Sequence, residues 1–240
     1  MMDRHPTQAS GIEAIIFDLD DTIVDTFTSL IEPLESEAAD EMVAAGMGES
    51  DSRRVKDLIL KLRREDPDRI EERLVQKFPQ ADGRALEARR AVFTKASLDE
   101  LQIKPAVKDM LRGLSERYDT YLLTTGPPDF QNRKLDQLEL RELFKGYAIL
   151  ASGSEETKEG WMASLIRGRY DPQSVIVVGN RLDNEIKAGQ RLGMRTVWVK
   201  SGEGSGLSPS DEATPDHIIS DIEEFPGVLA EIESECGRAA

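Results

Sequence analysis

Three carboxylates stand close together near the start of the chain. Asp18, Asp20 and Asp21 come directly after a run of apolar residues in the stretch AIIFDLDDTIVDT, residues 14–26. Like charges at this spacing repel one another, and Asp is a poor strand residue. The stretch is therefore consistent with a bound metal ion, with a pair of catalytic acids, or with a solvated turn.

Short segments rich in β-branched and aliphatic residues predict the strands that would position these acids. Helix-like sequence or turn residues follow them, which is the pattern of buried parallel strands. The fold class is therefore predicted as α/β, with a Rossmann-like doubly wound parallel sheet. The predicted strands are EAIIFDL (13–19), DTYLLTT (119–125), GYAILAS (146–152), SVIVVGN (174–180), RTVWVKS (195–201) and DHIIS (216–220).

The segments between these strands show the periodicity of amphipathic helices. PAVKDMLRGLSERY (105–118) places Val107, Met110, Leu111 and Leu114 on one face. The same periodicity predicts helices over 129–144, 161–170 and 184–193. Gly193 is predicted to cap the last of these at its C-terminus.

Between residues 27 and 103 the pattern changes to charge-rich helical sequence with no strand signal. Examples are SLIEPLESEAADEMVAAG (29–46), RRVKDLILKLRRED (53–66) and GRALEARRAVFTKAS (83–97). We therefore expect an all-helical cap domain at 27–103, inserted into an α/β core domain made of 1–26 and 104–240. The charged helices are consistent with a solvated exterior or with a lid over an active site, and the lid interpretation depends on the position of the insert alone.

Composition limits the classes of partner. The chain has 240 residues, 46 of them Asp or Glu and 31 Lys or Arg, for a formal net charge of −15. This charge repels a phosphate backbone and argues against nucleic acid as a partner, and it requires local positive charge at any phosphate site. No apolar run reaches the length of a membrane span, and the first residues lack the apolar stretch of a secretion signal. The single cysteine, Cys236, cannot form an internal disulfide, so the sequence predicts a reducing, cytoplasmic location.

Polar side chains follow several of the predicted strands. Thr124 lies at the end of the second strand, and a polar loop leading to Lys158 follows the strand at 146–152. Asn180, Asp183 and Glu185 follow the apolar run VIVVG, residues 175–179. Ligands of open α/β sheets bind at the carboxyl ends of strands. These groups and the acids after the first strand are therefore expected at one edge of the sheet.

Each group also has a simpler explanation. Asp-rich strand ends are common turns, and Thr is a favoured strand residue. Lys158 is consistent with a surface lysine, with Lys134 and Lys145 as rivals for its role. Asp183 and Glu185 are consistent with first-turn acids that face a helix dipole. One shared site explains all of these positions together, whereas the simpler explanations require independent coincidences at several strand ends.

The order of these motifs resembles the haloacid dehalogenase (HAD) superfamily, and specifically its phosphatase branch with a helical type 1 cap. Asp18-Leu19-Asp20-Asp21-Thr22 matches the Asp-x-Asp-x-Thr motif of this superfamily in full, and Leu122-Leu123-Thr124 matches its second motif. Lys158 is the candidate for the third motif. The segment from Gly179 to Glu185 is the candidate for the acidic fourth motif.

The resemblance implies a role for each matched residue. It implies an Mg²⁺-dependent phosphomonoester hydrolase that acts on a small phosphorylated metabolite, with Asp18 as the nucleophile that forms an aspartyl-phosphate and Asp20 as the acid and base. Thr124 would hydrogen-bond a phosphate oxygen, and Lys158 would neutralise phosphate and hold Asp18. Asp18, the backbone carbonyl of Asp20 and the fourth motif would bind Mg²⁺.

The fourth motif departs from the family pattern. Asn180 stands where the family usually carries Asp, and Glu185 stands in the place of a later Asp, with Asp183 as a further candidate ligand. An Asn carbonyl binds Mg²⁺ without adding charge, so we expect a working but weaker metal site. The departures also keep open a catalytically weak or inactive protein that binds phosphate or a partner, and a phosphomutase of the same superfamily. The sequence does not indicate the substrate or the oligomeric state.

Overall fold

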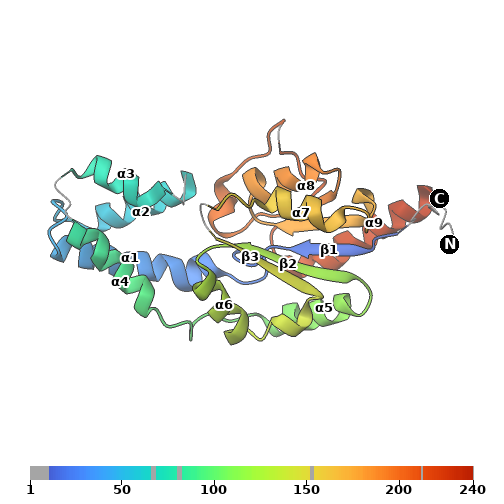
Figure 1. Cartoon of the computed structure of the whole chain (residues 1–240), viewed down its shortest axis with the longest axis horizontal. Helices are drawn as coiled ribbons and strands as arrows, with labels where there is room; N and C mark the ends of the chain where they lie inside the picture. Colours follow the sequence, from blue (N-terminus) through green and yellow to red (C-terminus); the bar gives the residue numbers. More distant parts are fainter. Residues whose placement is uncertain (1–10, 66–68, 80–82, 152–153, 212, 240) are drawn as a thin grey trace. The chain divides into compact units, whose positions relative to one another are not determined.

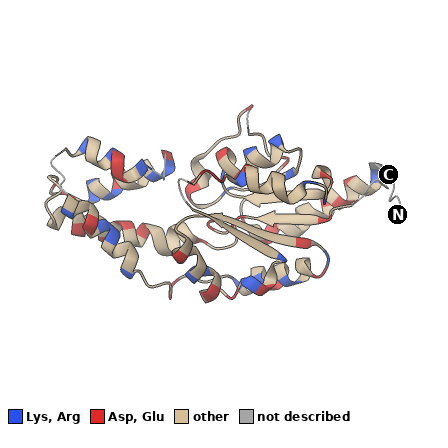
Figure 2. Cartoon of the chain, viewed as in Figure 1, with Lys and Arg blue, Asp and Glu red and all other residues tan. Residues whose placement is uncertain are grey.

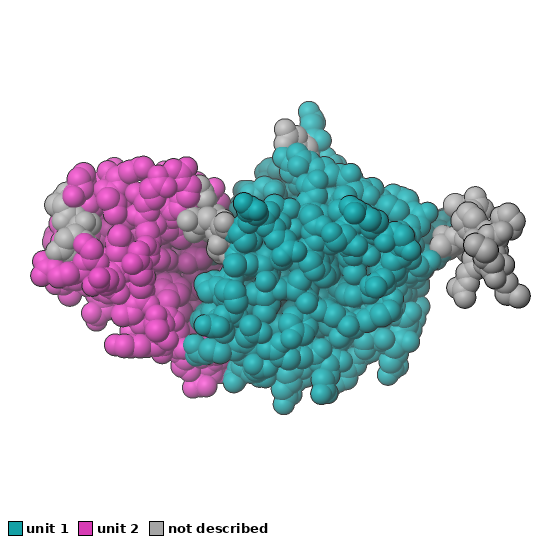
Figure 3. Space-filling view, viewed as in Figure 1, with its two compact units in different colours: residues 1–24, 103–240 teal, residues 25–102 magenta. Residues whose placement is uncertain are grey.

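The computed structural model of the chain describes residues 11–239, except 66–68, 80–82, 152–153 and 212. The chain divides into two compact units. Unit 1 comprises residues 1–24 and 103–240, and unit 2 comprises residues 25–102 (Figure 3). Each unit has its own buried core and is described by itself below.

Unit 1 is built on a six-stranded sheet in the order β3-β2-β1-β4-β5-β6, of which Figure 1 labels β1, β2 and β3. Every neighbouring pair is parallel, which confirms the predicted α/β fold class. Each strand lies within a predicted segment, although Ser152, at the end of the third, lies outside the described residues. The strands are β1 (Ala14–Phe17), β2 (Asp119–Thr125), β3 (Gly146–Leu150), β4 (Val175–Gly179), β5 (Arg195–Val199) and β6 (His217–Ile219).

Alternate residues of β1 face opposite layers, because side chains in a strand point to the two faces in turn. Ala14 and Ile16 belong to a buried cluster with Met162 and Ala188 of the helices after β3 and β4. Phe17 instead packs edge-on against Phe225, with ring centroids 5.5 Å apart. Both faces of the sheet are thus covered, as in a doubly wound fold. The ribbon positions of Lys, Arg, Asp and Glu lie mainly on helices rather than on strands (Figure 2).

The helices of unit 1 connect the strands. They are α5 (Pro105–Ser115), α6 (Pro128–Gln137), α7 (Lys158–Ile166), α8 (Lys187–Arg191) and α9 (Phe225–Ala239), with short turns at Arg141–Leu143, Pro172–Ser174, Leu182–Ile186, Gly202–Gly206 and Ile222–Glu224. Gly193 caps α8 as predicted, with a φ of 75°. None of the helices in the described part of the chain is long and apolar enough to cross a membrane.

The helix predicted over 129–144 is shorter in the structure. It ends at Gln137, and Glu139 takes a φ of 52°. The Leu140 N–H then donates to the Leu135 carbonyl at 3.0 Å, which closes the helix end. The prediction of one continuous helix was wrong because this local cap outweighs the apolar periodicity that continues to Phe144.

The regular secondary structure of the described residues of unit 2 is all helical. It contains a π-helical turn at Phe27–Ile31 followed by α1 (Glu32–Ala44), α2 (Ser52–Glu65), α3 (Ile70–Lys77) and α4 (Gly83–Lys95). Helix α1 packs against both α2 and α4. The core of the unit is apolar, with Met42, Val55, Ile59, Leu74 and Ala85 fully buried.

One charged cluster lies inside this helical unit. Glu35 of α1 is fully buried and accepts hydrogen bonds from Arg89 of α4, at 3.0 Å from Nε and 2.5 Å from Nη2. Arg63 of α2 donates to the same carboxylate at 2.8 Å. The cluster therefore joins three helices through one buried charge.

Candidate active site

Asp18 lies at the carboxyl end of the central strand. Its backbone N–H donates to the Val178 carbonyl at 2.9 Å, which continues the pairing of β1 with β4 one residue past the strand. Its side chain is buried, and Lys158 Nζ donates to Asp18 Oδ1 at 2.6 Å. Lys158 Nζ also donates to Glu185 Oε2 at 3.1 Å. The structure thus brings together predicted residues from the ends of three strands.

Local structure holds Lys158 and Glu185 in place. Thr157 caps α7, its hydroxyl accepting from the Gly160 N–H at 3.0 Å, so Lys158 begins the helix in a fixed position. Glu185 is turned inward, and its Oε1 accepts from the backbone N–H of Arg181 at 2.7 Å. Gly179 makes room for this side chain, because a Cβ at that position would overlap Glu185. Glu185 therefore belongs to the buried network rather than to a solvated helix start.

Burial dominates the electrostatics of this network. It raises the pKa of the Asp18 carboxyl to about 7, against the opposing charge of Lys158 and with further increases from Glu185 and Asp20. Burial alone would lower the pKa of Lys158, but Asp18 and Glu185 outweigh it and raise this pKa above its ordinary value. Lys158 therefore stays charged, and the site favours additional positive charge beside Asp18.

Asp20 has its own partners on helix α6. Lys134 Nζ donates to Asp20 Oδ1 at 2.5 Å, and Gln131 Nε2 donates to Asp20 Oδ2 at 2.8 Å. Sequence reasoning missed Gln131 and considered Lys134 only as a rival of Lys158. No motif marks these two residues, and only their spacing of three on one helix face placed them together.

Thr124 is buried at the end of β2 as predicted. Its Oγ1 lies 3.2 Å from Gln131 Nε2, so the same amide contacts both Thr124 and Asp20. Thr124 and Asp20 are therefore linked through one side chain.

The two remaining fourth-motif residues, Asn180 and Asp183, lie in different surroundings. Asn180 is buried, and its backbone carbonyl accepts from Trp198 Nε1 at 2.8 Å. Its side-chain amide makes no hydrogen bond to the described residues, which leaves it able to bind a ligand. Asp183 is exposed and forms a two-pronged ion pair with Arg181, at 2.9 Å from Nε and 2.8 Å from Nη2. In the part of the chain that the structure describes, Asp183 lies outside the network that joins Asp18, Lys158 and Glu185.

Asp21, to which the sequence assigned no role, is held by the turn at Gly202–Gly206. Its backbone takes a φ of 57°, its carboxylate accepts from the Glu203 N–H at 3.1 Å, and its carbonyl accepts from the Ser201 hydroxyl. A Cβ at Gly202 would overlap the Asp21 side chain, and one at Gly204 would overlap the Asn180 carbonyl. This turn therefore sets the backbone between Asp20 and Thr22 and supports Asn180.

The residues present are compatible with Mg²⁺. Among the described residues, no three acidic, His or Cys side chains form a ready-made metal cluster. Mg²⁺ does not require one, since it commonly binds one or two carboxylates and completes its shell with water and phosphate oxygens. The carboxylates of Asp18, Asp20 and Glu185 outnumber the ammonium groups of Lys158 and Lys134. A cation would balance the excess negative charge.

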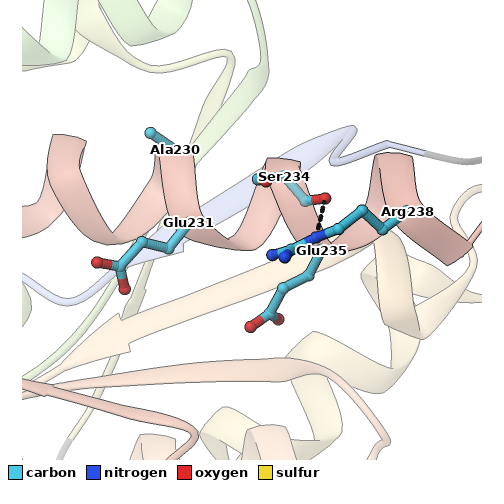
Figure 4. Close-up of a pocket in the computed structure, with 5 residues that line it drawn as sticks. All are labelled: Ala230, Glu231, Ser234, Glu235 and Arg238. Carbon is cyan, nitrogen blue, oxygen red and sulfur yellow. Dashed lines mark hydrogen bonds between the residues drawn. The ribbon is translucent and has the colours of Figure 1, made fainter.

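A surface hollow elsewhere on unit 1 carries no comparable chemistry. It is lined by Ala230, Glu231, Ser234, Glu235 and Arg238, all on helix α9 (Figure 4). Arg238 Nε donates to the Ser234 carbonyl at 3.2 Å, a contact within the helix. Because none of the predicted site residues lines this hollow, the candidate site remains the carboxyl edge of the sheet.

Comparison with known proteins decides the family. A family model described as haloacid dehalogenase-like hydrolase matches residues 12–193, which is most of the chain and includes Asp18, Lys158 and Glu185. The chain belongs to the haloacid dehalogenase-like hydrolases. The resemblance to this superfamily that its motifs indicated is thereby confirmed.

Curated HAD relatives include proteins named as phosphatases. Glyceraldehyde 3-phosphate phosphatase of Pyrococcus furiosus is 29% identical over 94% of this chain and 95% of its own length. N-acylneuraminate-9-phosphatase of Rattus norvegicus is 24% identical over 93% of this chain and 96% of its own length. The similarity spans nearly the full length of these relatives.

Solved structures of HAD proteins share the fold. The HAD-hydrolase YfnB from Bacillus subtilis, described as bound to magnesium, superposes with a TM-score of 0.64 and 20% identity, covering 91% of this chain and 99% of that one. A haloacid dehalogenase-like family hydrolase from Xanthomonas campestris gives a TM-score of 0.67 and 17% identity, over 95% and 99% of the two chains. At these identities the likeness supports the fold alone.

Proposed function

We propose that this HAD hydrolase is an Mg²⁺-dependent phosphatase that cleaves small phosphate monoesters through a phosphorylated Asp18. The observation that carries the proposal is the buried pairing of Asp18 with Lys158, with Asp20 only two residues away. Both curated relatives described above are named for phosphate esters of small metabolites, glyceraldehyde 3-phosphate and the 9-phosphate of N-acylneuraminate. A terminal phosphate on such a compound is the substrate class that we propose here.

In the first step an Oδ of Asp18 attacks the phosphorus atom and the bond between phosphorus and the ester oxygen breaks. Asp20, in its acid form, gives its proton to that oxygen, and the alcohol leaves. Lys158 offsets negative charge on the transferring group, and the Thr124 hydroxyl donates to one of its oxygens. The product of this step is an acyl phosphate on Asp18.

In the second step water attacks the phosphorus of this acyl phosphate. Asp20, now ionised, takes the proton of the water, the bond between Asp18 and phosphorus breaks, and inorganic phosphate leaves. Asp18 returns as a carboxylate and Asp20 as an acid. The two residues therefore complete a cycle without any other proton donor.

Mg²⁺, when bound, would neutralise phosphate charge and favour the ionised form of Asp18. Asp18, the Asp20 carbonyl, Asn180 and Glu185 are the proposed residues that hold it. Glu185 shares the Lys158 ammonium group with Asp18, and Asn180 directly follows β4, the strand paired with β1. Asp183 is instead paired with Arg181.

Unit 2 is proposed to serve as the cap domain of this enzyme. Its insertion point supports the proposal, because the unit begins at residue 25, directly after the turn that carries Asp18 and Asp20. A cap in such a position excludes water from the reacting groups and contributes to substrate choice.

The direct test is hydrolysis of p-nitrophenyl phosphate and of a panel of terminal sugar phosphates, with and without Mg²⁺. We expect turnover that requires Mg²⁺ and that is fastest on one member of the panel. Absence of turnover on every ester, with Mg²⁺ bound, would instead support a protein that binds phosphate or a partner without catalysis.

Asn180→Asp is expected to tighten Mg²⁺ binding by about tenfold, roughly 1.4 kcal/mol, because it adds one negative charge to the ligand set. Titration calorimetry measures the affinity, and turnover is expected to persist. Asn184→Asp is the control, since it adds the same charge at an exposed position of the same turn. Equal Mg²⁺ affinity of the two variants would show that Asn180 is not a ligand.

A further inference from the structure

Both carboxylate oxygens of Asp20 are held by donors from one helix. Gln131 donates to Oδ2 at 2.8 Å and Lys134 donates to Oδ1 at 2.5 Å, from positions three residues apart on α6. Gln131 and Lys134 are both 2% exposed, whereas the Asp20 side chain is 28% exposed. The acid is therefore accessible while its two partners are not.

The amide of Gln131 has one possible orientation in this setting. Its Nε2 is surrounded by acceptors, since besides Asp20 it lies 2.9 Å from the Thr125 carbonyl and 3.2 Å from Thr124 Oγ1. If the amide were turned over, Oε1 would face the carboxylate and the carbonyl, and both contacts would become repulsive. Gln131 is therefore a fixed donor.

This orientation of the Gln131 amide leaves its oxygen without a hydrogen bond to the described part of the chain, which the stability of the fold does not explain. Gln131 Oε1 is buried and has no hydrogen-bond partner among the described residues. A buried acceptor without a partner destabilises the folded state, and native proteins rarely retain one. The Gln131 amide nevertheless keeps the orientation in which Nε2 donates to Asp20 and Thr124.

Gly126 provides the space that this amide needs. Its φ is 154°, and a Cβ at this position would come within 2.7 Å of Gln131 Nε2 and 3.2 Å of Gln131 Cγ. Any larger residue would push the amide away from Asp20. The backbone after β2 and the side chain on α6 are thus fitted to each other.

We infer that Gln131 is a positioning residue that orients Asp20 for proton delivery to the leaving group, with Thr124 fixed by the same amide. The inference rests on the proposed phosphatase function and deepens it. A carboxylate held through both oxygens keeps a single orientation, and reaction rates depend strongly on such alignment. Without the amide, Asp20 Oδ2 would lose this donor, and the carboxylate would be less tightly oriented.

The test compares two esters that differ in their need for a proton. Phenyl phosphate releases a basic phenolate that requires protonation, whereas p-nitrophenyl phosphate releases a stable anion that does not. In Gln131→Met, which keeps length and removes the donor, we expect kcat/KM for phenyl phosphate to fall by about 100-fold. For p-nitrophenyl phosphate the expected fall is less than about tenfold, because formation of the phosphoenzyme then needs no acid.

Two further variants complete the experiment. Gln137→Met makes the same change at an exposed position of the same helix and is expected to match the wild type on both esters. Gly126→Ala leaves Gln131 in the chain but displaces its amide. It is therefore expected to lower kcat/KM more for phenyl phosphate than for p-nitrophenyl phosphate, and it provides the test if Gln131→Met does not fold. Thermal unfolding of each variant checks the fold.

The outcomes separate this inference from the function on which it rests. Equal losses on the two esters, or no loss, with an active wild type would overturn the positioning role of Gln131 and leave the phosphatase intact. A wild type that hydrolyses neither ester in the presence of Mg²⁺ would overturn the proposed function and this inference together.

Discussion

Asp18→Asn is expected to abolish Mg²⁺-dependent turnover, with kcat lower by at least about 1,000-fold. An amide cannot supply the anionic oxygen that attacks phosphorus, and the nearby carboxylate of Asp20 is held by Gln131 and Lys134. The fold is expected to persist, because Glu185 remains as a charged partner of Lys158. Steady-state hydrolysis of p-nitrophenyl phosphate measures the loss.

A second measurement is acid quenching of the reaction with an ester that is radiolabelled in its phosphate group. Label is expected to remain on the wild-type protein and to be absent from Asp18→Asn. Asp136→Asn, which neutralises an exposed carboxylate of the same unit, is the matched control and is expected to behave like the wild type. Retention of turnover or label in Asp18→Asn would refute the covalent role of Asp18.

Glu35→Gln is expected to destabilise the helical unit by about 3–5 kcal/mol, because it leaves the guanidinium groups of Arg63 and Arg89 without their buried counter-charge. The variant keeps the size of the side chain, so the change in packing is small. Urea unfolding followed by circular dichroism measures the effect as a lower midpoint for the helical unit.

The control for this prediction is Glu37→Gln, on the exposed face of the same helix, which is expected to change stability by less than about 0.5 kcal/mol. A triple variant, Glu35→Leu with Arg63→Met and Arg89→Met, is expected to recover much of the lost stability, since apolar replacement removes the desolvation cost. Equal midpoints for Glu35→Gln and Glu37→Gln would show that the buried charge does not hold the three helices together.

Strand positions were predictable because each strand of this sheet is a short, continuous apolar run. DTYLLTT matches β2 residue for residue, and the other strands lie inside their predicted segments. The order of the motifs alone indicates the family. That order also placed Asp18, Lys158 and Glu185 at one edge, because parallel strands bring their carboxyl ends together.

The partners of Asp20 could not be predicted in the same way. Gln131 and Lys134 lie in the middle of a helix, where the sequence pattern indicates only that one face is buried. Which polar side chain they would meet depends on the packing of α6 beside the end of β1, an arrangement that local sequence does not encode. The role of Asp21 was hidden for a similar reason, because its partners Ser201 and Glu203 lie about 180 residues away along the chain.

The position of β1 also has a consequence for the order in which the chain can fold as it is synthesised. β1 is the first strand made, yet it pairs on one side with β2 and on the other with β4, which ends at Gly179. The last described helix of unit 2 ends at Lys95, so these helices can form early. One edge of β1 stays open until β4 is complete, about 160 residues after the end of β1. Fragments that stop before β4 would therefore expose an apolar strand edge prone to aggregation.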